Sequence, residues 1–315
     1  MAKRAQPIIH IGGPKTASTT LQRAFLTPHP KVLYFGEDGD GCNLEESKAL
    51  YSQILYDDAF YQKDKCKAIF EQRLSLAREN NQQLIYSNVD ICSSPIPTLC
   101  AQRLKVLLPD AKIMMVVRNQ LDSLVSFYVN HGSRLRNVPQ SYFRKYVSIE
   151  DWLKHCEMMH PLSDFSHFLF YTHLKPYIDL FGKENIVLLR FEDYIHNRDS
   201  FTQTLGEIFS MDKDEIASYL GNKNERKRRS KSEFYIHNII YSFPYVMRKY
   251  CGHDKLAKAA RSLSGLMGFK KSYSEIELPT QWKVKLSEIY SVENRKLEEL
   301  FSLSLDEYSY PLSKN

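Results

Sequence analysis

Residues 8–26 read IIHIGGPKTASTTLQRAFL, and this stretch combines the patterns of a strand, a turn and a helix. It opens with an apolar, β-branched run that predicts a buried strand, breaks at two glycines and a proline, and continues with the spacing of a helix. Lys15 is the only lysine in the stretch, and it stands among hydroxyl side chains. A strand, a glycine turn and a polar helix start in this order predict a loop that binds an anion.

This loop offers three kinds of anion-binding group. Gly12 and Gly13 let the backbone turn sharply and approach a ligand, and the amides and positive dipole end of the next helix suit a phosphate. Lys15 adds a full positive charge, and the neighbouring hydroxyls can donate hydrogen bonds. The candidate binding residues are Gly13, Pro14, Lys15, Thr16, Ala17, Ser18, Thr19 and Thr20. The alternative is a plain strand-to-helix turn with a Ser/Thr N-cap and a solvent-facing lysine.

The nucleoside-triphosphate P-loop, G-x-x-x-x-G-K-[ST], is the usual rival for such a loop. Here Pro14 precedes Lys15, so the glycine that this motif requires before its lysine is missing. The sequence therefore disfavours a kinase or ATPase, and an atypical P-loop kinase stays as an alternative.

Strand patterns alternate with helical patterns along most of the chain. The predicted strands are residues 7–12, 31–35, 83–87, 111–117 and 185–191. The predicted helices are residues 18–26, one or more within 57–80, 97–108 and 119–131, and beyond residue 232 the pattern is mainly helical. Strands separated by helices imply right-handed crossovers. We therefore expect an α/β fold like that of P-loop NTPases, with a parallel central sheet flanked by helices and a mainly helical C-terminal part.

Composition narrows the class of protein. With 315 residues and 43% hydrophobic side chains, the chain can bury a substantial core, and no linker or repeat divides it. It has neither an apolar run of about 18 residues nor a secretory signal. Its six cysteines are scattered without a CxxC pair, which argues against a zinc site and a disulfide framework. These features predict a single domain over residues 1–315, a cytoplasmic location, no metal and no transmembrane segment.

Much of the net charge of +6 lies in residues 223–231, KNERKRRSK, which hold six basic side chains and one acid. A solvated surface loop and an anion-binding segment are both open interpretations of such a run. A nucleic-acid arm is disfavoured, because the run has no interleaved aromatic side chains for base stacking.

The segment GGPKTASTTL resembles the 5′-phosphosulfate loop, written around K-T-G-T-T, of sulfotransferases that use 3′-phosphoadenosine 5′-phosphosulfate (PAPS). Ala17 stands where that pattern usually has glycine, so the match is strained if Ala17 needs a positive φ. The resemblance implies a second element that binds the 3′-phosphate, formed by an arginine ending a strand and a serine eight residues later. Arg118 and Ser126 in AKIMMVVRNQLDSLVSFY fit it. A guanidinium fork can grip two phosphate oxygens, and a helix serine can add a bond.

Further segments resemble the same family less specifically. IVLLRFEDY resembles its R-[YF]-E-D segment, in which Arg190 and Glu192 could be a structural ion pair or ligand contacts. The basic run is similar in place and charge to a late loop that covers the 3′-phosphate, which makes candidates of Arg226, Arg228 and Arg229. Residues 278–311 resemble the last helix and Tyr-Pro end of bacterial carbohydrate-type sulfotransferases.

The resemblance implies transfer of the PAPS sulfonate to an acceptor hydroxyl, on a saccharide or glycolipid, without a metal. Lys15 would stabilise the leaving phosphate, because negative charge grows there in an in-line transfer. The acceptor also needs a general base. The candidates are Glu37, with Asp38 and Asp40 as fallbacks, then Asp90, then His131. The alternatives are the atypical kinase and a non-catalytic module that binds a nucleotide or polyanion.

Overall fold

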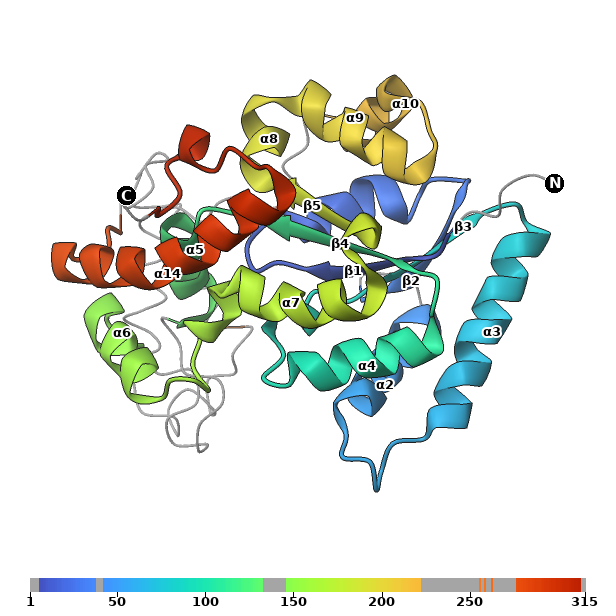
Figure 1. Ribbon diagram of the computed structural model, residues 1–315, viewed down its shortest axis with the longest axis horizontal. Coiled ribbons are helices and arrows are strands. Elements are labelled where there is room, and N and C mark those ends of the chain that lie inside the picture. The colour runs from blue at the N-terminus through green and yellow to red at the C-terminus, as the bar shows by residue number, and fades with distance from the viewer. Residues whose placement is uncertain are drawn as a thin grey trace. The chain divides into compact units, whose positions relative to one another are not determined.

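Five parallel strands form the central sheet, in the order β2-β3-β1-β4-β5 (Figure 1). The computed structural model describes residues 6–37, 42–132, 146–221 and 276–312, with the single positions 255, 258 and 262. The strands are β1 (Ile8–Gly12), β2 (Val32–Gly36), β3 (Gln83–Ser87), β4 (Lys112–Val117) and β5 (Ile186–Arg190). Every neighbouring pair is parallel. This confirms the predicted α/β fold and all five predicted strands to within about a residue at most ends.

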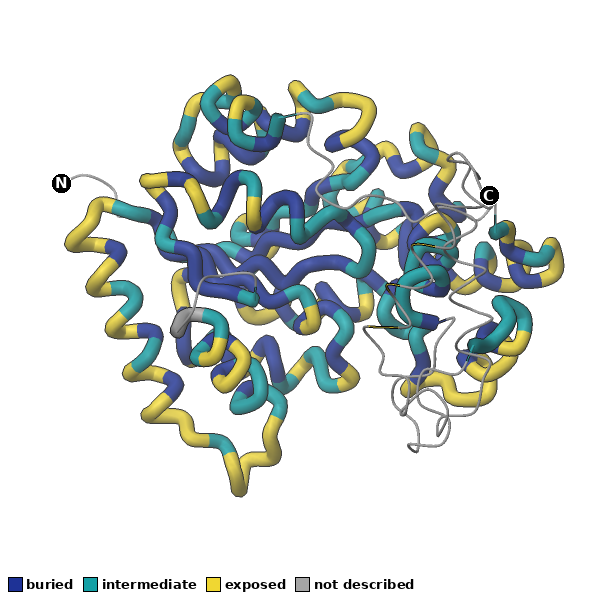
Figure 2. Tube along the Cα trace, turned by 180° about the vertical axis from the view of Figure 1, so that it is seen from behind, coloured by how far each residue is buried: buried dark blue, intermediate teal, exposed yellow. Residues whose placement is uncertain are grey.

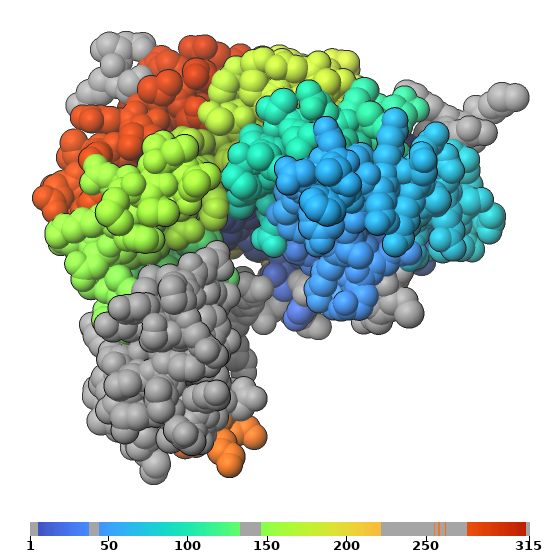
Figure 3. Space-filling model, turned by 90° about the horizontal axis from the view of Figure 1, so that it is seen from below, coloured from blue at the N-terminus to red at the C-terminus, as the bar shows by residue number. Residues whose placement is uncertain are grey.

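Helices cover both faces of the sheet, as a parallel sheet requires. One face carries η1 (Leu21–Leu26), α8 (Phe191–His196), α9 (Arg198–Phe209) and α10 (Lys213–Leu220). The other carries α2 (Cys42–Leu55), α3 (Lys63–Glu79), α4 (Pro97–Leu107) and α7 (Phe170–Phe181). Figure 2 shows the strands as the buried centre and the outer turns of the helices as exposed. Seen from below, α2, α3 and α4 form the blue to teal surface in Figure 3.

The core between η1 and the sheet is built from apolar side chains of both. Ile8, Ile85 and Met114 from three neighbouring strands pack with Leu21 and Phe25 of the η1 helix, all at most 4% exposed. This packing fixes the segment that follows the predicted anion loop. The loop therefore lies between a buried strand and a buried helix.

Two helices differ from the sequence prediction. The helix expected over residues 18–26 begins as α1 (Ser18–Thr20) and then widens into the π-helix η1. Helix α2 was not predicted, and the helix expected within residues 57–80 is α3, which begins at Lys63. The other described helical elements include η2 (Ile91–Ser93), α5 (Gln120–Phe127), η3 (Tyr128–Gly132), α6 (Ile149–Met158), η4 (Ser166–Phe168) and α14 (Thr280–Phe301).

The chain divides into two compact units by its internal contacts. The first contains residues 1–120, 166–225 and 289–315, and with them the whole sheet. The second contains residues 121–165 and 226–288. The single domain expected over residues 1–315 stays a prediction.

Two further sequence expectations concern thiols and membranes. Cys66, Cys92, Cys100 and Cys156 are buried and are not joined in disulfides. Among the described helices, none combines the length and the apolar character needed to cross a bilayer.

Candidate active site

The loop after β1 has a backbone that can surround an anion. Lys15 has a φ of 65° and Ala17 a φ of 59°, whereas Thr16 between them is not in this left-handed region. Alternation of left-handed with ordinary backbone turns successive N–H groups toward one concavity, which is a common way of binding phosphate. The predicted anion loop thus has the backbone form that the prediction requires.

The two glycines of the loop are needed because neighbouring backbone lies against them. A Cβ on Gly12 would lie 2.5 Å from the Cα of Val89, and one on Gly13 would lie 1.9 Å from the carbonyl oxygen of Val116. Gly12 also has a φ of 83°. These contacts seat the loop between the ends of β3 and β4, where no larger residue fits.

Side-chain and helix bonds hold the second half of the loop. The Thr16 hydroxyl donates to the carbonyl of Gly13 at 2.8 Å and lies 3.1 Å from the hydroxyl of Ser18. The carbonyl of Ala17 accepts from the amides of Thr20 and Leu21. Thr16 is buried, so it shapes the loop from beneath, and Lys15 is half-buried at its rim.

The backbone of Ala17 is strained. A non-glycine residue in the left-handed region costs roughly 1 to 2 kcal/mol, and Ala17 occupies this region at the start of α1. The match to K-T-G-T-T is therefore strained at Ala17, as expected for a residue that needs a positive φ.

Arg118, at the end of β4, joins the loop directly. Its Nη1 donates to the carbonyl oxygen of Lys15 at 3.0 Å, across more than a hundred residues of sequence. Its guanidinium also stacks on the ring of Phe191, 4.6 Å from the ring centre. The structure thus brings together the two elements that the sequence singled out separately. Ser126 lies on α5, which begins two residues after Arg118 and enters the second unit.

A buried polar cluster lies beneath the loop, and the sequence analysis did not single it out. The Ser87 hydroxyl lies 2.8 Å from Nδ1 of His10 and accepts from Nε2 of Gln22 at 3.0 Å. His10 Nε2 is buried without a hydrogen-bond partner. Burial lowers the pKa of His10 to about 4, so its imidazole is neutral at pH 7. A histidine inside a β-branched strand was the signal that could have revealed this cluster.

Acidic and aromatic side chains gather at the carboxyl ends of β2 and β3. Glu37 follows β2 directly, and its amide donates to the carbonyl of Ser87 at 3.4 Å. The Tyr51 hydroxyl donates to the backbone carbonyl of Asp90 at 3.1 Å. Burial first, and then the charges of Asp90, Cys100 and Glu37, raise the pKa of Tyr51.

Asp90, the second candidate base, has a perturbed carboxyl. Asp90 reaches the surface, and the protein around its carboxyl raises the pKa by desolvation, while the nearby His167 acts in the opposite direction. A raised pKa moves a carboxylate toward the range of a working general base. The structure therefore brings Glu37 and Asp90 into one neighbourhood on the sheet edge that also carries the anion loop.

His131 and the residues outside the described ranges are not part of the first unit's described site. His131 belongs to η3 in the second unit, where its ring stacks on Phe127 at 5.0 Å. The described residues do not include Asp38, Asp40, Arg226, Arg228 and Arg229.

Arg190 and Glu192 do not pair with each other. Arg190 grips both carboxylate oxygens of Asp193 at 2.8 and 2.9 Å and reaches Glu307 at 2.9 Å. Glu192 instead accepts from the backbone amide of Asn119 at 2.9 Å. The expected pair between Arg190 and Glu192 is therefore absent, and each side chain bonds to another partner.

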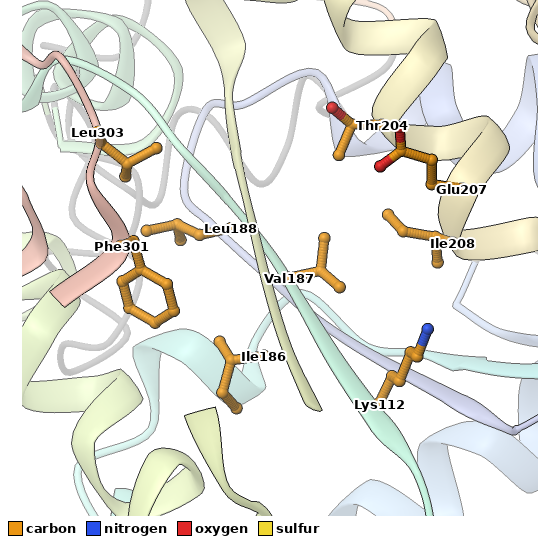
Figure 4. A pocket seen from close by; sticks show the side chains of 9 residues that line it. All are labelled: Lys112, Ile186, Val187, Leu188, Thr204, Glu207, Ile208, Phe301 and Leu303. Carbon is orange, nitrogen blue, oxygen red and sulfur yellow. The ribbon is translucent and has the colours of Figure 1, made fainter. Parts of the chain in front are cut away.

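A surface hollow along β5 is not part of this site (Figure 4). It is lined by side chains that include Lys112 and Ile186, which begin β4 and β5, whereas the anion loop follows the opposite, carboxyl end of β1. Among the residues that the structure describes, no group of three or more His, Cys, Asp or Glu side chains could hold a metal ion.

Comparisons with known proteins agree with this geometry. The family model described as the sulfotransferase domain matches residues 7–235. A sulfotransferase from Alicyclobacillus acidocaldarius has a similar fold, with a TM-score of 0.54, 14% identity, and coverage of 98% of this chain and 99% of that one. No curated protein matches the chain in sequence.

Two further solved structures are similar at lower TM-scores. Mouse sulfotransferase SULT7A1 complexed with PAP has a TM-score of 0.40 and 16% identity, over 95% of this chain and 84% of that one. The sulfotransferase domain from the curacin biosynthetic pathway has a TM-score of 0.43 and 13% identity, over 99% of this chain and 100% of that one.

Proposed function

The chain belongs to the sulfotransferase family, and we propose that it transfers the sulfonate of PAPS to a hydroxyl of a saccharide or glycolipid. One observation supports the choice of PAPS: Arg118, which we propose for the 3′-phosphate, donates to the backbone of Lys15 in the loop that we propose for the 5′-phosphosulfate. ATP has no 3′-phosphate for Arg118 to hold. The juxtaposition therefore favours PAPS over the atypical kinase.

The residues of the loop fit the anionic end of PAPS. When bound, PAPS supplies an activated sulfonate, whose transfer leaves adenosine 3′,5′-bisphosphate. The left-handed backbone at Lys15 and Ala17 supports a concavity of N–H donors for the 5′-phosphosulfate, which we assign to residues 13–20. For the 3′-phosphate we propose Arg118 and Ser126, with the three arginines of the basic run as further candidates.

Lys15 stabilises the charge that develops on the leaving phosphate. In a largely dissociative in-line transfer, by analogy with phosphoryl transfer, negative charge grows on the bridging oxygen. A cation and backbone dipoles that are already in place need not reorganise as the charge appears, which makes such stabilisation a large contribution to catalysis. The half-buried position of Lys15 on a backbone held by Arg118 supports this role.

Glu37 is our first choice for the base that accepts the acceptor's proton. It follows β2 directly, at the carboxyl edge of the sheet where the anion loop also lies. Asp90 is the second choice and shares this neighbourhood through Tyr51. His131 is the third.

The proposals for the acceptor and for the location rest on a sequence resemblance and on the buried thiols. The resemblance of residues 278–311 to carbohydrate-type enzymes favours a saccharide or glycolipid hydroxyl, and a panel of acceptors with radiolabelled PAPS would identify it. Four buried free thiols are typical of a reducing compartment, so we propose that the enzyme acts in the cytoplasm.

Calorimetric titration with adenosine 3′,5′-bisphosphate and with AMP tests the proposed nucleotide. Charge-assisted bonds are worth roughly 1.5 to 3 kcal/mol each, so two of them give at least about a hundredfold preference for the bisphosphate. Arg118→Ala should remove most of this preference while leaving AMP binding nearly unchanged. The matched control is Arg78→Ala, which removes an exposed arginine of α3 and should change neither affinity. Equal affinity of the unmodified protein for the two nucleotides would contradict the proposal.

A further inference from the structure

Asn119 follows Arg118, and it begins with Gln120 the turn after β4. Asn119 is bound by residues 305–311 near the C-terminal end of the chain, which we call the tail. Asn119 donates through its side-chain amide to the carbonyl oxygens of Tyr308 at 3.2 Å and Ser309 at 2.8 Å. Its backbone amide donates to Oε1 of Glu192 at 2.9 Å. Asn119 is only 7% exposed, so all three bonds are shielded from water. The end of β4 is thus fixed by groups that lie far from it in the sequence.

Glu192 connects Asn119 to Tyr310 of the tail. Its other oxygen, Oε2, accepts from the Tyr310 hydroxyl at 2.7 Å, and both side chains are buried. Burial and the adjacent Glu192 raise the pKa of Tyr310, so its hydroxyl remains a donor. The residue before Glu192 is Phe191, whose ring stacks on the guanidinium of Arg118. The first turn of α8 therefore contacts both Arg118 and the residue that follows it.

The next residue of the turn is bound in the same way. The side-chain amides of Gln120 and Asn294 form a reciprocal pair, in which each donates to the oxygen of the other. Asn294 also donates to the carbonyl of Pro311 at 2.8 Å. Both amides have no exposed surface. Loss of either partner would leave buried polar groups unsatisfied, which is costly.

We propose that a C-terminal clasp, made of the side chains of Glu192, Asn294 and Tyr310 and of the backbone of residues 308–311, is a positioning element that holds Arg118 in place for the 3′-phosphate. The inference rests on the proposed function. The clasp does not touch the nucleotide in this proposal. It fixes the backbone of Asn119 and Gln120, and with it the direction in which Arg118 leaves β4. Opening the clasp exposes those two amides to water and releases Arg118 from the Lys15 carbonyl.

The side chain of Tyr308 forms a second anchor of the tail, and this anchor does not contact Asn119, although the backbone carbonyl of Tyr308 does. The Tyr308 hydroxyl donates to Oδ1 of Asp193 at 2.9 Å, and Asp193 is itself gripped by Arg190. The two tail tyrosines thus bind two neighbouring carboxylates at similar distances, but only the partner of Tyr310 contacts Asn119. Removing the hydroxyl of Tyr308 or of Tyr310 therefore offers a matched comparison between two residues of the same short segment.

The test compares Tyr310→Phe with Tyr308→Phe by calorimetry with adenosine 3′,5′-bisphosphate and AMP. Substitutions in a network that connects two sites commonly change the coupling between those sites by about a few-fold to thirtyfold. We therefore expect Tyr310→Phe to reduce the ratio of bisphosphate affinity to AMP affinity about tenfold. Tyr308→Phe should leave the ratio unchanged, although it also lowers the melting temperature. An unchanged ratio in Tyr310→Phe, or an equal fall in both variants, overturns the positioning role.

Hydrogen exchange on the unmodified full chain tests the same coupling without any variant. The tail amides of Ser309 and Tyr310 are hydrogen-bonded to Asp306 and Leu305 and exchange only when the tail opens. Coupling is reciprocal, so saturating bisphosphate should slow exchange in residues 305–311 more than saturating AMP does. Equal protection by the two nucleotides overturns the inference.

Failure of this inference is separable from failure of the proposed function. If the unmodified protein prefers the bisphosphate and Tyr310→Phe keeps that preference, only the clasp proposal falls. If the unmodified protein does not distinguish the two nucleotides, the proposed function falls, and the clasp proposal falls with it.

Discussion

At the residue scale, the site depends on side chains that are held by the backbone of distant residues. Arg118 donates a hydrogen bond to the backbone carbonyl of Lys15, and the Arg118 guanidinium stacks on the ring of Phe191. Pre-arranged charge of this kind is effective because it is already oriented when the transition state forms.

Lys15→Ala should reduce kcat by about 10²- to 10³-fold, because a preorganised group that stabilises developing charge is worth that much. The affinity for the acceptor should change far less, since Lys15 acts on the leaving phosphate. Steady-state kinetics with radiolabelled PAPS measure both quantities. Lys31→Ala, which removes an exposed lysine paired with Glu215, is the control and should retain full activity. Unchanged turnover in Lys15→Ala would remove Lys15 from the mechanism.

The two candidate bases can be separated by their amide variants. Glu37→Gln should reduce kcat/KM by about 10²- to 10⁴-fold and remove the acidic limb of its pH profile, because an amide cannot accept the proton. Asp90→Asn should have a smaller effect and keep that limb. The reverse result would identify Asp90 as the base, and its raised pKa would then place the acidic limb above the range of an ordinary aspartate.

The sequence could single out Lys15 and Arg118 because each belongs to a motif with a local physical reason. The R-[YF]-E-D segment drew attention to Glu192, but it could not show that Glu192 binds Asn119 or that Phe191 stacks on Arg118, since both contacts join distant parts of the chain. Arg190 illustrates the same limit: the sequence made Glu192 a candidate ion-pair partner, whereas its actual partners, Asp193 and Glu307, depend on how α8 and the tail meet.

At the element scale, helical spacing predicted α1 and η1 as one helix but not their change of geometry. The amide of Thr27 donates to the carbonyl of Gln22, five residues earlier, which is the π-type bond. The Gln22 side chain meanwhile reaches Ser87 beneath the loop. Periodicity alone cannot distinguish the wider turn. Helix α2 also escaped prediction, and in the fold it packs on β2.

Ala17→Gly should raise the free energy of unfolding by about 1 kcal/mol, because glycine adopts a positive φ without steric cost. Urea denaturation measures the change. The control is Ala217→Gly within α10, where the same substitution should lower the free energy of unfolding by about 0.5 to 1 kcal/mol. A loss of stability in both variants would mean that Ala17 does not hold its left-handed conformation in solution.

At the scale of the whole molecule, segments from across the sequence converge on one edge of the sheet. The anion loop, the end of β4, α8 and the C-terminal tail meet through bonds that span more than a hundred residues, such as Arg118 to Lys15 and Asn119 to Ser309. Local patterns predicted the five strands and a parallel sheet flanked by helices. They could not predict this convergence, because the docking of the tail depends on which distant polar groups form hydrogen bonds with one another.

The buried histidine of β1 makes the stability of the whole fold depend on pH. Burial lowers the pKa of His10 from 6.5 to about 4. Between these values the unfolded chain binds a proton that the folded chain does not, so the free energy of unfolding falls as the pH decreases from 6.5 to 4. A shift of this size corresponds to roughly 3 kcal/mol at the acidic end of the window.

His10→Asn should remove this contribution, because asparagine does not titrate and its side-chain amide can take the place of Nδ1 beside Ser87. Urea denaturation of both proteins at several pH values between 4 and 7 measures the difference. Other groups, including the buried His173, titrate in both proteins and therefore cancel in the comparison. His155→Asn, at an exposed position of α6, is the control and should follow the unmodified protein. We expect the stability curves of His10→Asn and the unmodified protein to converge as the pH falls, and parallel curves would contradict a neutral, buried His10 in the folded state.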